Sequence, residues 1–209
     1  MGGVLKFYTA PGTCGLATQI ALEEAGADYE LVRVDFAAQE QRGEAYLRLN
    51  PKSRVPILVT DRGVISETPA LLLYVAQTYP GAGLAPLDDP FALAQMQAFT
   101  SYLCGTVHPA RAHMYRGYRW ADDPAAIAEM KHKAPEVVGD CFALIDAQML
   151  AGPWVLGDRY SVADAYLFTL SNWLDRDGFD RARFPKVEDH WRRMQERPAV
   201  QRALATGMA

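Results

Sequence analysis

Cys14 is the residue whose placement in this sequence most clearly suggests reaction chemistry. It follows a short apolar segment and a turn at Pro11 and Gly12, and a stretch of helical periodicity begins with it. The first backbone N–H groups of a helix have no intrahelical partner, and the helix dipole there favours anions. Such a position would stabilise the thiolate of Cys14, or that of a bound small thiol. The alternative is that Cys14 is a small apolar residue packed beneath the strand.

Two further segments carry groups that could bind a peptide-like ligand. A cis bond at Val55-Pro56 would leave the Val55 backbone groups free to pair with an extended ligand, although a trans proline at a strand start is commoner. At Glu67-Thr68 a turn leads into a helix, so that backbone N–H groups and the Thr68 hydroxyl could bind a carboxylate while Glu67 pairs with an ammonium. The alternative for Thr68 is simple capping of the helix, with Pro69 at its first position.

Hydrophobic periodicity predicts the elements that position these residues. Alternating or apolar segments indicate strands, and stripes with a spacing of three to four residues indicate helices. The predicted strands are residues 4–8, 29–34, 55–60 and 64–65, and the predicted helices are residues 14–25, 39–49 and 68–79. The resulting order, β-α-β-α-β-β-α, is that of the thioredoxin-like fold.

The remainder of the chain shows helical patterns. A Pro/Gly-rich stretch at residues 81–88 predicts a linker. Predicted helices begin at Asp89-Pro90 and Asp123-Pro124, with interruptions at His108-Pro109 and at Pro135, and a capping-box pattern at Ser161 and Asp164 precedes an apolar helix. The sequence therefore predicts an α/β thioredoxin-like domain at residues 1–80 and an all-helical domain at residues 89–209.

Composition excludes several classes of partner. The chain has 209 residues, half of them apolar, and a formal net charge of −4 that is spread evenly over both halves. This balance argues against nucleic acid and anionic membranes as partners. We find neither a secretory-signal pattern nor an apolar run long enough to span a membrane, so we expect a cytoplasmic location. The three cysteines and four histidines show neither disulfide-framework nor metal-ligand spacing, so we expect no metal site.

Four motifs in order resemble those of cytosolic glutathione transferases, most closely the bacterial beta class. They are FYTAPGTCGLA, NPKSRVPIL, ISETPALLLYVA and WVLGDRYSVADAYLF, and together they span nearly the whole chain. The resemblance implies that the thioredoxin-like domain binds glutathione as a co-substrate. It also implies that the helical domain supplies a pocket for a small hydrophobic electrophile, and that the protein is a homodimer.

The resemblance also assigns roles to individual residues. Cys14 and His108 would face the glutathione sulfur, the latter brought there by the helical domain. Val55 would hydrogen-bond the cysteinyl backbone of glutathione across a cis bond before Pro56. The remaining contacts with glutathione would come from Glu67 and Thr68 at its γ-glutamyl end and from Arg54 and Ser101. A serine, Ser53, stands where the family usually has glycine.

Two hydroxyl residues compete with Cys14 and His108 for the activation of sulfur. Tyr8 and Thr13 resemble the catalytic tyrosine and the serine or threonine of other classes, and either hydroxyl could stabilise a thiolate by hydrogen bonding. We rank Cys14 first, then His108, Tyr8 and Thr13; the alternative for Tyr8 is a core aromatic residue. Cys104 and Cys141 are predicted to lie in the core, and the candidates for the electrophile pocket are Tyr115, Tyr118 and Trp173.

The preferred hypothesis is thus a glutathione transferase that directs the thiolate of glutathione at an electrophilic carbon. A second hypothesis is a one-cysteine, glutaredoxin-like thiol-disulfide oxidoreductase; a vicinal dithiol is excluded because Pro11 and Ala17 occupy the positions that a second cysteine would need. A third is a non-catalytic protein of the same fold that carries a ligand.

Overall fold

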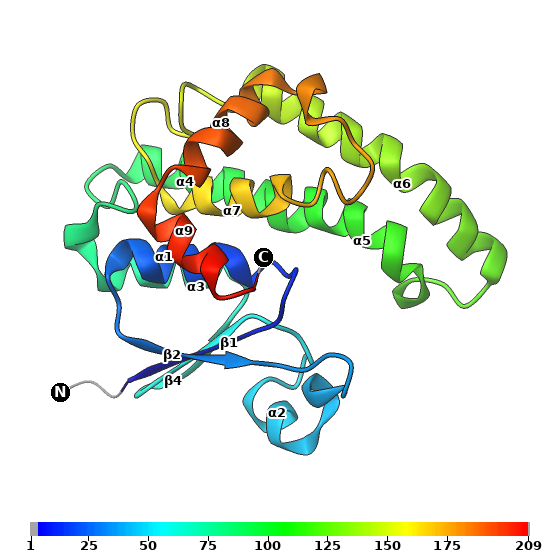
Figure 1. The fold of residues 1–209 in the computed structure, drawn as a ribbon, viewed down its shortest axis with the longest axis horizontal. Helices are drawn as coiled ribbons and strands as arrows, with labels where there is room; N and C mark the ends of the chain where they lie inside the picture. The colour runs from blue at the N-terminus through cyan, green and yellow to red at the C-terminus, as the bar shows by residue number, and fades with distance from the viewer. Residues whose placement is uncertain (1–3, 209) are drawn as a thin grey trace.

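The computed structural model describes residues 4–208 and contains a four-stranded sheet with three helices, over which a second set of helices is packed (Figure 1). The strands are β1 (Leu5–Thr9), β2 (Tyr29–Arg33), β3 (Ile57–Thr60) and β4 (Gly63–Ser66). The helices of this first part are α1 (Gly15–Ala25), α2 (Glu44–Leu49) and α3 (Thr68–Thr78). None of the helices within residues 4–208 is both long and apolar enough to cross a bilayer.

The sheet has the strand order β2-β1-β3-β4. β1 pairs with β2 in parallel and with β3 antiparallel, and β3 forms an antiparallel hairpin with β4. A parallel unit followed by a hairpin and a helix confirms the predicted thioredoxin-like order. The strand ends differ from the prediction by one or two residues: β1 is shifted by one residue, β2 is shorter and β4 is longer at both ends. β3 begins only after Pro56 because proline cannot donate to the ladder.

The two faces of the sheet bury different residues, since successive side chains of a strand point to opposite sides. Phe7 of β1 is fully buried in the large core that includes Ala17 of α1 and Leu71 of α3. Tyr8 lies on the other face, in the small cluster around Tyr46 of α2. Figure 1 shows α1 and α3 between the sheet and the second set of helices, with α2 on the far side of the sheet.

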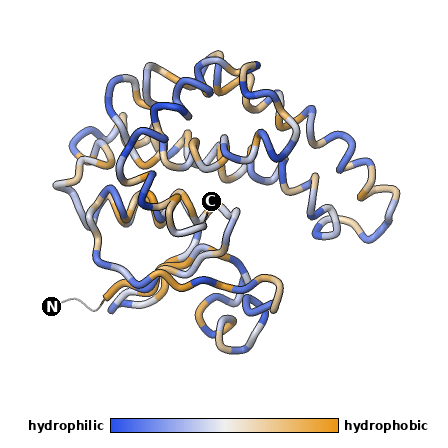
Figure 2. Tube along the Cα trace, viewed as in Figure 1, coloured by the Kyte–Doolittle hydropathy of each residue, from blue (hydrophilic) through white to orange (hydrophobic). Residues whose placement is uncertain are grey.

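The second part of the chain is helical, as predicted. It contains α4 (Pro90–Tyr102), α5 (His108–Arg116), α6 (Pro124–Leu144), α7 (Val162–Ser171), α8 (Pro185–Gln195) and α9 (Pro198–Ala205). The tube in Figure 2 alternates between hydrophilic and hydrophobic stretches along α6, as expected for a helix that buries one face. All ten residues of α7 are buried, which confirms the predicted central apolar helix.

Two predicted helix interruptions differ in the structure. Pro135 does not break α6, which continues through it. The carbonyl that loses its hydrogen-bond donor there belongs to Lys131, an exposed residue whose backbone is accessible to water. At His108-Pro109 the chain stays helical, but α4 ends at Tyr102 and a five-residue π-helical segment, Leu103–Val107, leads into α5.

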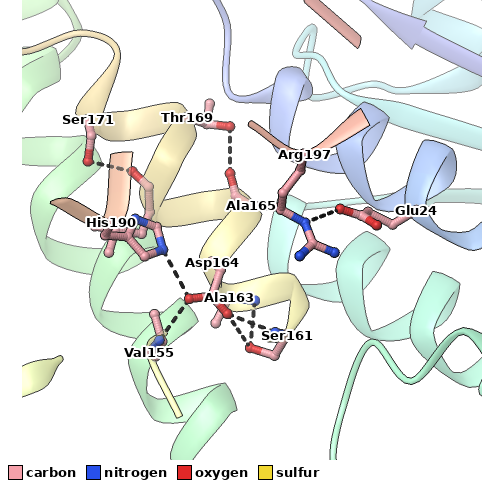
Figure 3. Close-up of polar contacts among 11 residues, drawn as sticks. Glu24, Val155, Ser161, Ala163, Asp164, Ala165, Thr169, Ser171, His190 and Arg197 are labelled. Carbon is pink, nitrogen blue, oxygen red and sulfur yellow. Dashed lines mark hydrogen bonds and ion pairs between the residues drawn. The ribbon is translucent and has the colours of Figure 1, made fainter. Parts of the chain in front are cut away.

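A buried polar network fixes the start of α7 (Figure 3). The Ser161 hydroxyl accepts from the Ala163 N–H at 3.3 Å, and the Asp164 carboxylate accepts from the Ser161 N–H at 2.8 Å, which confirms the predicted capping box. Asp164 also accepts from the Val155 N–H at 2.7 Å and lies 3.0 Å from Nε2 of His190 in α8. The network therefore ties α7, α8 and the preceding loop together.

Two predictions in the first part of the chain need correction. The predicted helix over residues 39–49 is a short 3-10 turn, Glu40–Arg42, followed by α2, because Gly43 adopts an extended conformation between them. Thr68 does not cap α3: the cap position is Glu67, and no side chain caps the helix. Pro69 is accordingly the second helical residue and not the first.

Candidate active site

A large cleft of about 1050 Å³ lies where the two parts of the chain meet. One side is formed by the start of α1, the loop before β3 and the start of α3, and the other side by the π-helical segment, α5 and the turn after it. Most of the residues proposed from the sequence line it, namely Thr13, Cys14, Arg54, Val55, Pro56, Glu67, Thr68 and His108.

Cys14 lies at the cap position of α1, one residue earlier than predicted, and its side chain is 9% exposed. The Thr68 hydroxyl donates a hydrogen bond to its sulfur at 3.4 Å. Burial raises the pKa of the Cys14 thiol, and the hydrogen bond from Thr68 only partly offsets this. This direction is opposite to the stabilisation of a Cys14 thiolate considered from the sequence and favours a neutral thiol in the free protein.

A glycine allows α1 to start this close to the sheet. A Cβ atom at Gly15 would lie 1.9 Å from Oγ1 of Thr9, far inside any allowed contact. The Thr13 hydroxyl donates to the Ala10 carbonyl at 2.7 Å and accepts from the Gly15 N–H at 3.3 Å. Thr13 thus holds the turn before α1 together, and its proton is already engaged.

The start of α3 combines an uncapped helix end with an acidic side chain. Glu67 adopts φ 74°, a left-handed conformation that costs of order 1–3 kcal/mol and is typical of functional sites. The Lys52 ammonium pairs with the Glu67 carboxylate and donates to the Ser66 hydroxyl at 2.7 Å. Because the side chain of Glu67, at the cap position, pairs with Lys52, it does not cap α3, and the first N–H groups of the helix have no side-chain acceptor.

The loop before β3 is held by two buried side chains. The Tyr46 hydroxyl and the Asn50 amide each donate to the Arg54 carbonyl at 2.7 Å. The bond between Val55 and Pro56 is cis, as the family resemblance implies, and the commoner trans form expected from the residues alone is wrong. Ser53 has φ 55°, a conformation that favours glycine, the residue that the family resemblance implies at this position.

His108 reaches the cleft from the first turn of α5. Its ring lies 5.1 Å from that of Trp173. Burial is the main cause that lowers the pKa of His108 to about 4, and the nearby guanidinium groups of Arg111, Arg116, Arg119 and Arg54 contribute to this shift in that order. The imidazole is therefore neutral at physiological pH, and it can offer either a donor or an acceptor to a ligand.

Two residues proposed from the sequence do not line the cleft. Tyr8 packs edge to face against Tyr46 on the opposite side of the sheet, with ring centroids 6.2 Å apart, in agreement with the core alternative. Ser101 is exposed on α4 and lies outside the residues that line the cleft.

The structure also brings residues to the cleft that the sequence analysis assigned to the core or overlooked. Cys104 is only partly buried and lines the cleft, whereas Cys141 is buried as predicted. Tyr166 of α7 also lines the cleft, and its fully buried hydroxyl has no hydrogen-bond partner of ordinary geometry among the described residues. Cys104 precedes His108 by four residues, so the shared helix face was a usable signal.

The cleft offers chemistry suited to a thiol ligand of peptide size. It provides backbone groups at a cis bond, an uncapped helix end beside a carboxylate, and a neutral thiol and imidazole. No set of three or more His, Cys, Asp or Glu side chains in the described part of the chain is placed to hold a metal ion.

Comparison with known proteins gives matches along the chain. The family models "Glutathione S-transferase, N-terminal domain" and "Glutathione S-transferase, C-terminal domain" match residues 3–77 and 111–198. Glutathione S-transferase GST-4.5 of Xanthomonas campestris pv. campestris is 30% identical over 96% of this chain and 97% of its own length.

Solved structures of similar proteins agree with this. A glutathione transferase homolog from Sulfitobacter with bound glutathione is 44% identical, with a TM-score of 0.95 over 99% of both chains. The beta class glutathione S-transferase of Sphingomonas chungbukensis is 32% identical, with a TM-score of 0.85 over 97% of this chain and 98% of the other.

Proposed function

Because this chain belongs to the glutathione S-transferase family, we propose that it is an enzyme that activates the thiol of glutathione for attack on an electrophilic small molecule. In the reaction, the thiol loses its proton, the thiolate sulfur bonds to the electrophilic carbon, and the leaving group departs with its electron pair. The observation that carries the proposal is that Cys14, the cis bond at Val55-Pro56 and the start of α3 line one cleft. Catalysis then consists of thiolate stabilisation and proximity.

The N-terminus of α3 carries groups that suit both charges of the γ-glutamyl group of glutathione. Its carboxylate would accept from the uncapped N–H groups of α3, where the helix dipole favours an anion. Its ammonium would pair with Glu67, in place of or beside Lys52. The cysteinyl part would pair with the Val55 backbone, which directs the glutathione sulfur toward the start of α1.

At the sulfur, we assign Cys14 the role of a hydrogen-bond donor and not of a nucleophile. Its pKa is raised by burial, so the thiol keeps the proton that a glutathione thiolate can accept. Thr68 orients it by donating to its sulfur at 3.4 Å. The neutral His108 ring offers a second donor, which also favours the thiolate.

The proposal is tested by turnover of a chloronitrobenzene with glutathione, followed by mass spectrometry of the adduct. We expect conversion well above the uncatalysed rate, and the thiolate absorbance of bound glutathione at neutral pH. Glu67→Gln should raise the KM for glutathione about tenfold, since it removes a charge from an ion pair. Glu30→Gln, at an exposed pair on the sheet, is the matched control. Absence of any adduct with several electrophiles would contradict the proposal.

A second candidate function is favoured by Cys104, which brings another thiol into the cleft that holds Cys14. A thiol-disulfide enzyme would form a mixed disulfide between Cys14 and one half of oxidised glutathione, releasing the other half as the thiol. Mass spectrometry after treatment with oxidised glutathione distinguishes the two functions. An unmodified Cys14 would exclude this second candidate.

The finer assignments rest on the family resemblance. We propose that the enzyme belongs to the beta class, forms a homodimer, acts in the cytoplasm and serves in detoxification. Light scattering of the purified protein measures the dimer directly, and a monomer at micromolar concentration would contradict that part of the proposal.

A further inference from the structure

The cleft is strongly basic although the whole chain is acidic. The formal net charge of the protein is −4. Among the described residues that line the cleft, Glu67 is the one acid, whereas seven are arginine or lysine: Arg42, Lys52, Arg54, Arg111, Arg116, Arg119 and Arg176. Glutathione carries two carboxylates and one ammonium, so it does not balance this excess.

Some of these cations are neutralised by the protein itself. Arg111 donates to both oxygens of the nearly fully buried Asp177, at 2.5 and 2.8 Å, and Lys52 pairs with Glu67. Arg54, Arg116 and Arg119 take part in no ion pair with any residue from 4 to 208. Arg42 and Arg176 form none among these residues either, so five guanidinium groups of the cleft lack a carboxylate partner.

Arg54, Arg116 and Arg119 line one cleft from both parts of the chain. Arg54 precedes the cis bond in the thioredoxin-like domain, and Arg116 and Arg119 belong to the end of α5 and the turn after it. Burial lowers the pKa of Arg119, and the neighbouring charges of Arg116 and Arg54 lower it further. Like charges that line one cleft repel one another, and an anion between them would relieve the repulsion.

Aromatic rings flank the same arginines. Tyr118 and Trp120, on either side of Arg119, are 58% and 50% exposed and line the cleft. Deeper in the cleft, the guanidinium of Arg111 lies 4.3 Å from the centroid of the Trp173 ring. Exposed aromatic surfaces in a concave site are suited to a planar, apolar part of a ligand.

The geometry points to an aromatic carboxylate as the second substrate: its carboxylate pairs with Arg116 and Arg119, and its ring lies against Tyr118 and Trp120. This inference rests on the proposed function and names the substrate class, in place of the hydrophobic electrophile expected from the sequence. The two carboxylates of glutathione bind elsewhere in the cleft, one at the start of α3 and the other at Arg54. The glutathione thiolate bonds to the ring carbon, the carbon–halogen bond breaks, and halide leaves with the electron pair.

The test compares 4-chloro-3-nitrobenzoate with its neutral analogue, 4-chloro-3-nitrobenzamide. Each kcat/KM is divided by the uncatalysed rate constant with glutathione, which removes the difference in intrinsic reactivity. We expect the carboxylate to be preferred at least about tenfold at low salt, and the preference to shrink as ionic strength rises.

Two variants test whether Arg116 and Arg119 cause this preference for the carboxylate. The double variant Arg116→Gln/Arg119→Gln should lower the normalised kcat/KM for the carboxylate about tenfold, change that for the amide less than about twofold, and leave the KM for glutathione unchanged. Arg62→Gln, in the exposed β3–β4 turn, is the control for loss of one positive charge elsewhere. An equal loss for both substrates, or a raised KM for glutathione, would overturn the inference.

A binding measurement separates this inference from the proposed function. Quenching of tryptophan fluorescence by unreactive 3-nitrobenzoate and 3-nitrobenzamide is followed with S-methylglutathione present. If neither chlorinated substrate turns over but the carboxylate binds preferentially, the proposed transfer fails and the anion site stands. If the amide binds equally well, the anion site fails whatever the turnover.

Discussion

His108 and His190 belong to the same helical domain, yet their surroundings are opposite in charge. His190 is 1% exposed and lies 3.0 Å from the Asp164 carboxylate, which also accepts from two backbone N–H groups (Figure 3). For His108, burial and four surrounding guanidinium groups together lower the pKa to about 4. One histidine completes a network inside the chain, whereas the other faces an excess of cations.

The helix starts repeat this contrast. Asp89, Asp123 and Ser161 cap α4, α6 and α7 with their own side chains. In contrast, α1 and α3, which begin at the cleft, have no side-chain cap. α2 and α9 also lack a side-chain cap from the cap residue but do not line the cleft, so the uncapped starts of α1 and α3 are open to a ligand because of where they lie.

The largest expected effect comes from disrupting the hydrogen-bond network of Asp164, in which the chain satisfies its own polar groups. Asp164→Ala removes the acceptor of Val155, Ser161 and His190 in a fully buried site, so we expect a loss of roughly 3–5 kcal/mol in the free energy of unfolding. Urea denaturation followed by circular dichroism measures it. Asp189→Ala, at an exposed pair, should change the value by less than about 0.5 kcal/mol. A loss below 1 kcal/mol for Asp164→Ala would contradict the role given to this network.

The next largest effect is on the pH dependence of stability, to which His108 contributes. Its pKa is about 4 in the folded protein and about 6.5 when unfolded, so the unfolded state binds more protons as pH falls through this window. Stability is therefore retained above pH 6.5 and declines below it, and His108→Asn should reduce the decline between pH 7 and 4.5 by about 2 kcal/mol. Urea titrations at several pH values test this, with exposed His132→Asn as the control. Parallel curves for wild type and His108→Asn would refute it.

A smaller effect tests the neutral thiol of Cys14. Cys14→Ala removes the proposed donor, so we expect kcat/KM to fall about tenfold and the kinetic pKa of glutathione to rise by about one unit. Cys14→Ser keeps a donor and should stay within about threefold of wild type. Thiolate titration and steady-state kinetics measure both quantities. If serine lost as much as alanine, Cys14 would instead act through its sulfur as a nucleophile.

The smallest expected effect is a gain in stability. Arg119→Gln removes one of the like charges in the cleft, so the free energy of unfolding should rise by about 0.5 kcal/mol at low salt and by less at high salt, because exposed charges are screened. Thermal denaturation at two salt concentrations measures the change. A salt-independent loss of stability would mean that Arg119 is held by contacts within the protein.

Local sequence patterns predicted most of the fold. The strand alternation, the apolar run of α7 and its capping box depend on neighbours within a few residues, so the sequence shows them directly. Pro135 was misjudged because the sequence does not show that the carbonyl it leaves unpaired is exposed to water.

The site was predicted less completely because its chemistry depends on contacts between distant segments. The raised pKa of Cys14 follows from burial by residues of other elements, and the Thr68 hydroxyl donates to a sulfur 54 positions away. The arginines at 116 and 119 were overlooked, although their alternation with Tyr115, Tyr118 and Trp120 was visible in the sequence. The sequence motifs predicted where the cleft lies, whereas its positive charge became evident only once the fold brought the arginines of distant segments to it.

The π-helical segment between α4 and α5 also sets the angular phase of everything that follows it. Each residue of an α-helix advances about 100° around the axis, and a π turn holds one residue more than the α turn it replaces. Deleting a single residue from Leu103–Val107 would leave a continuous helix but rotate His108 and the arginines of α5 away from Cys14. The extra residue of the π turn thus sets the direction in which this half of the site faces.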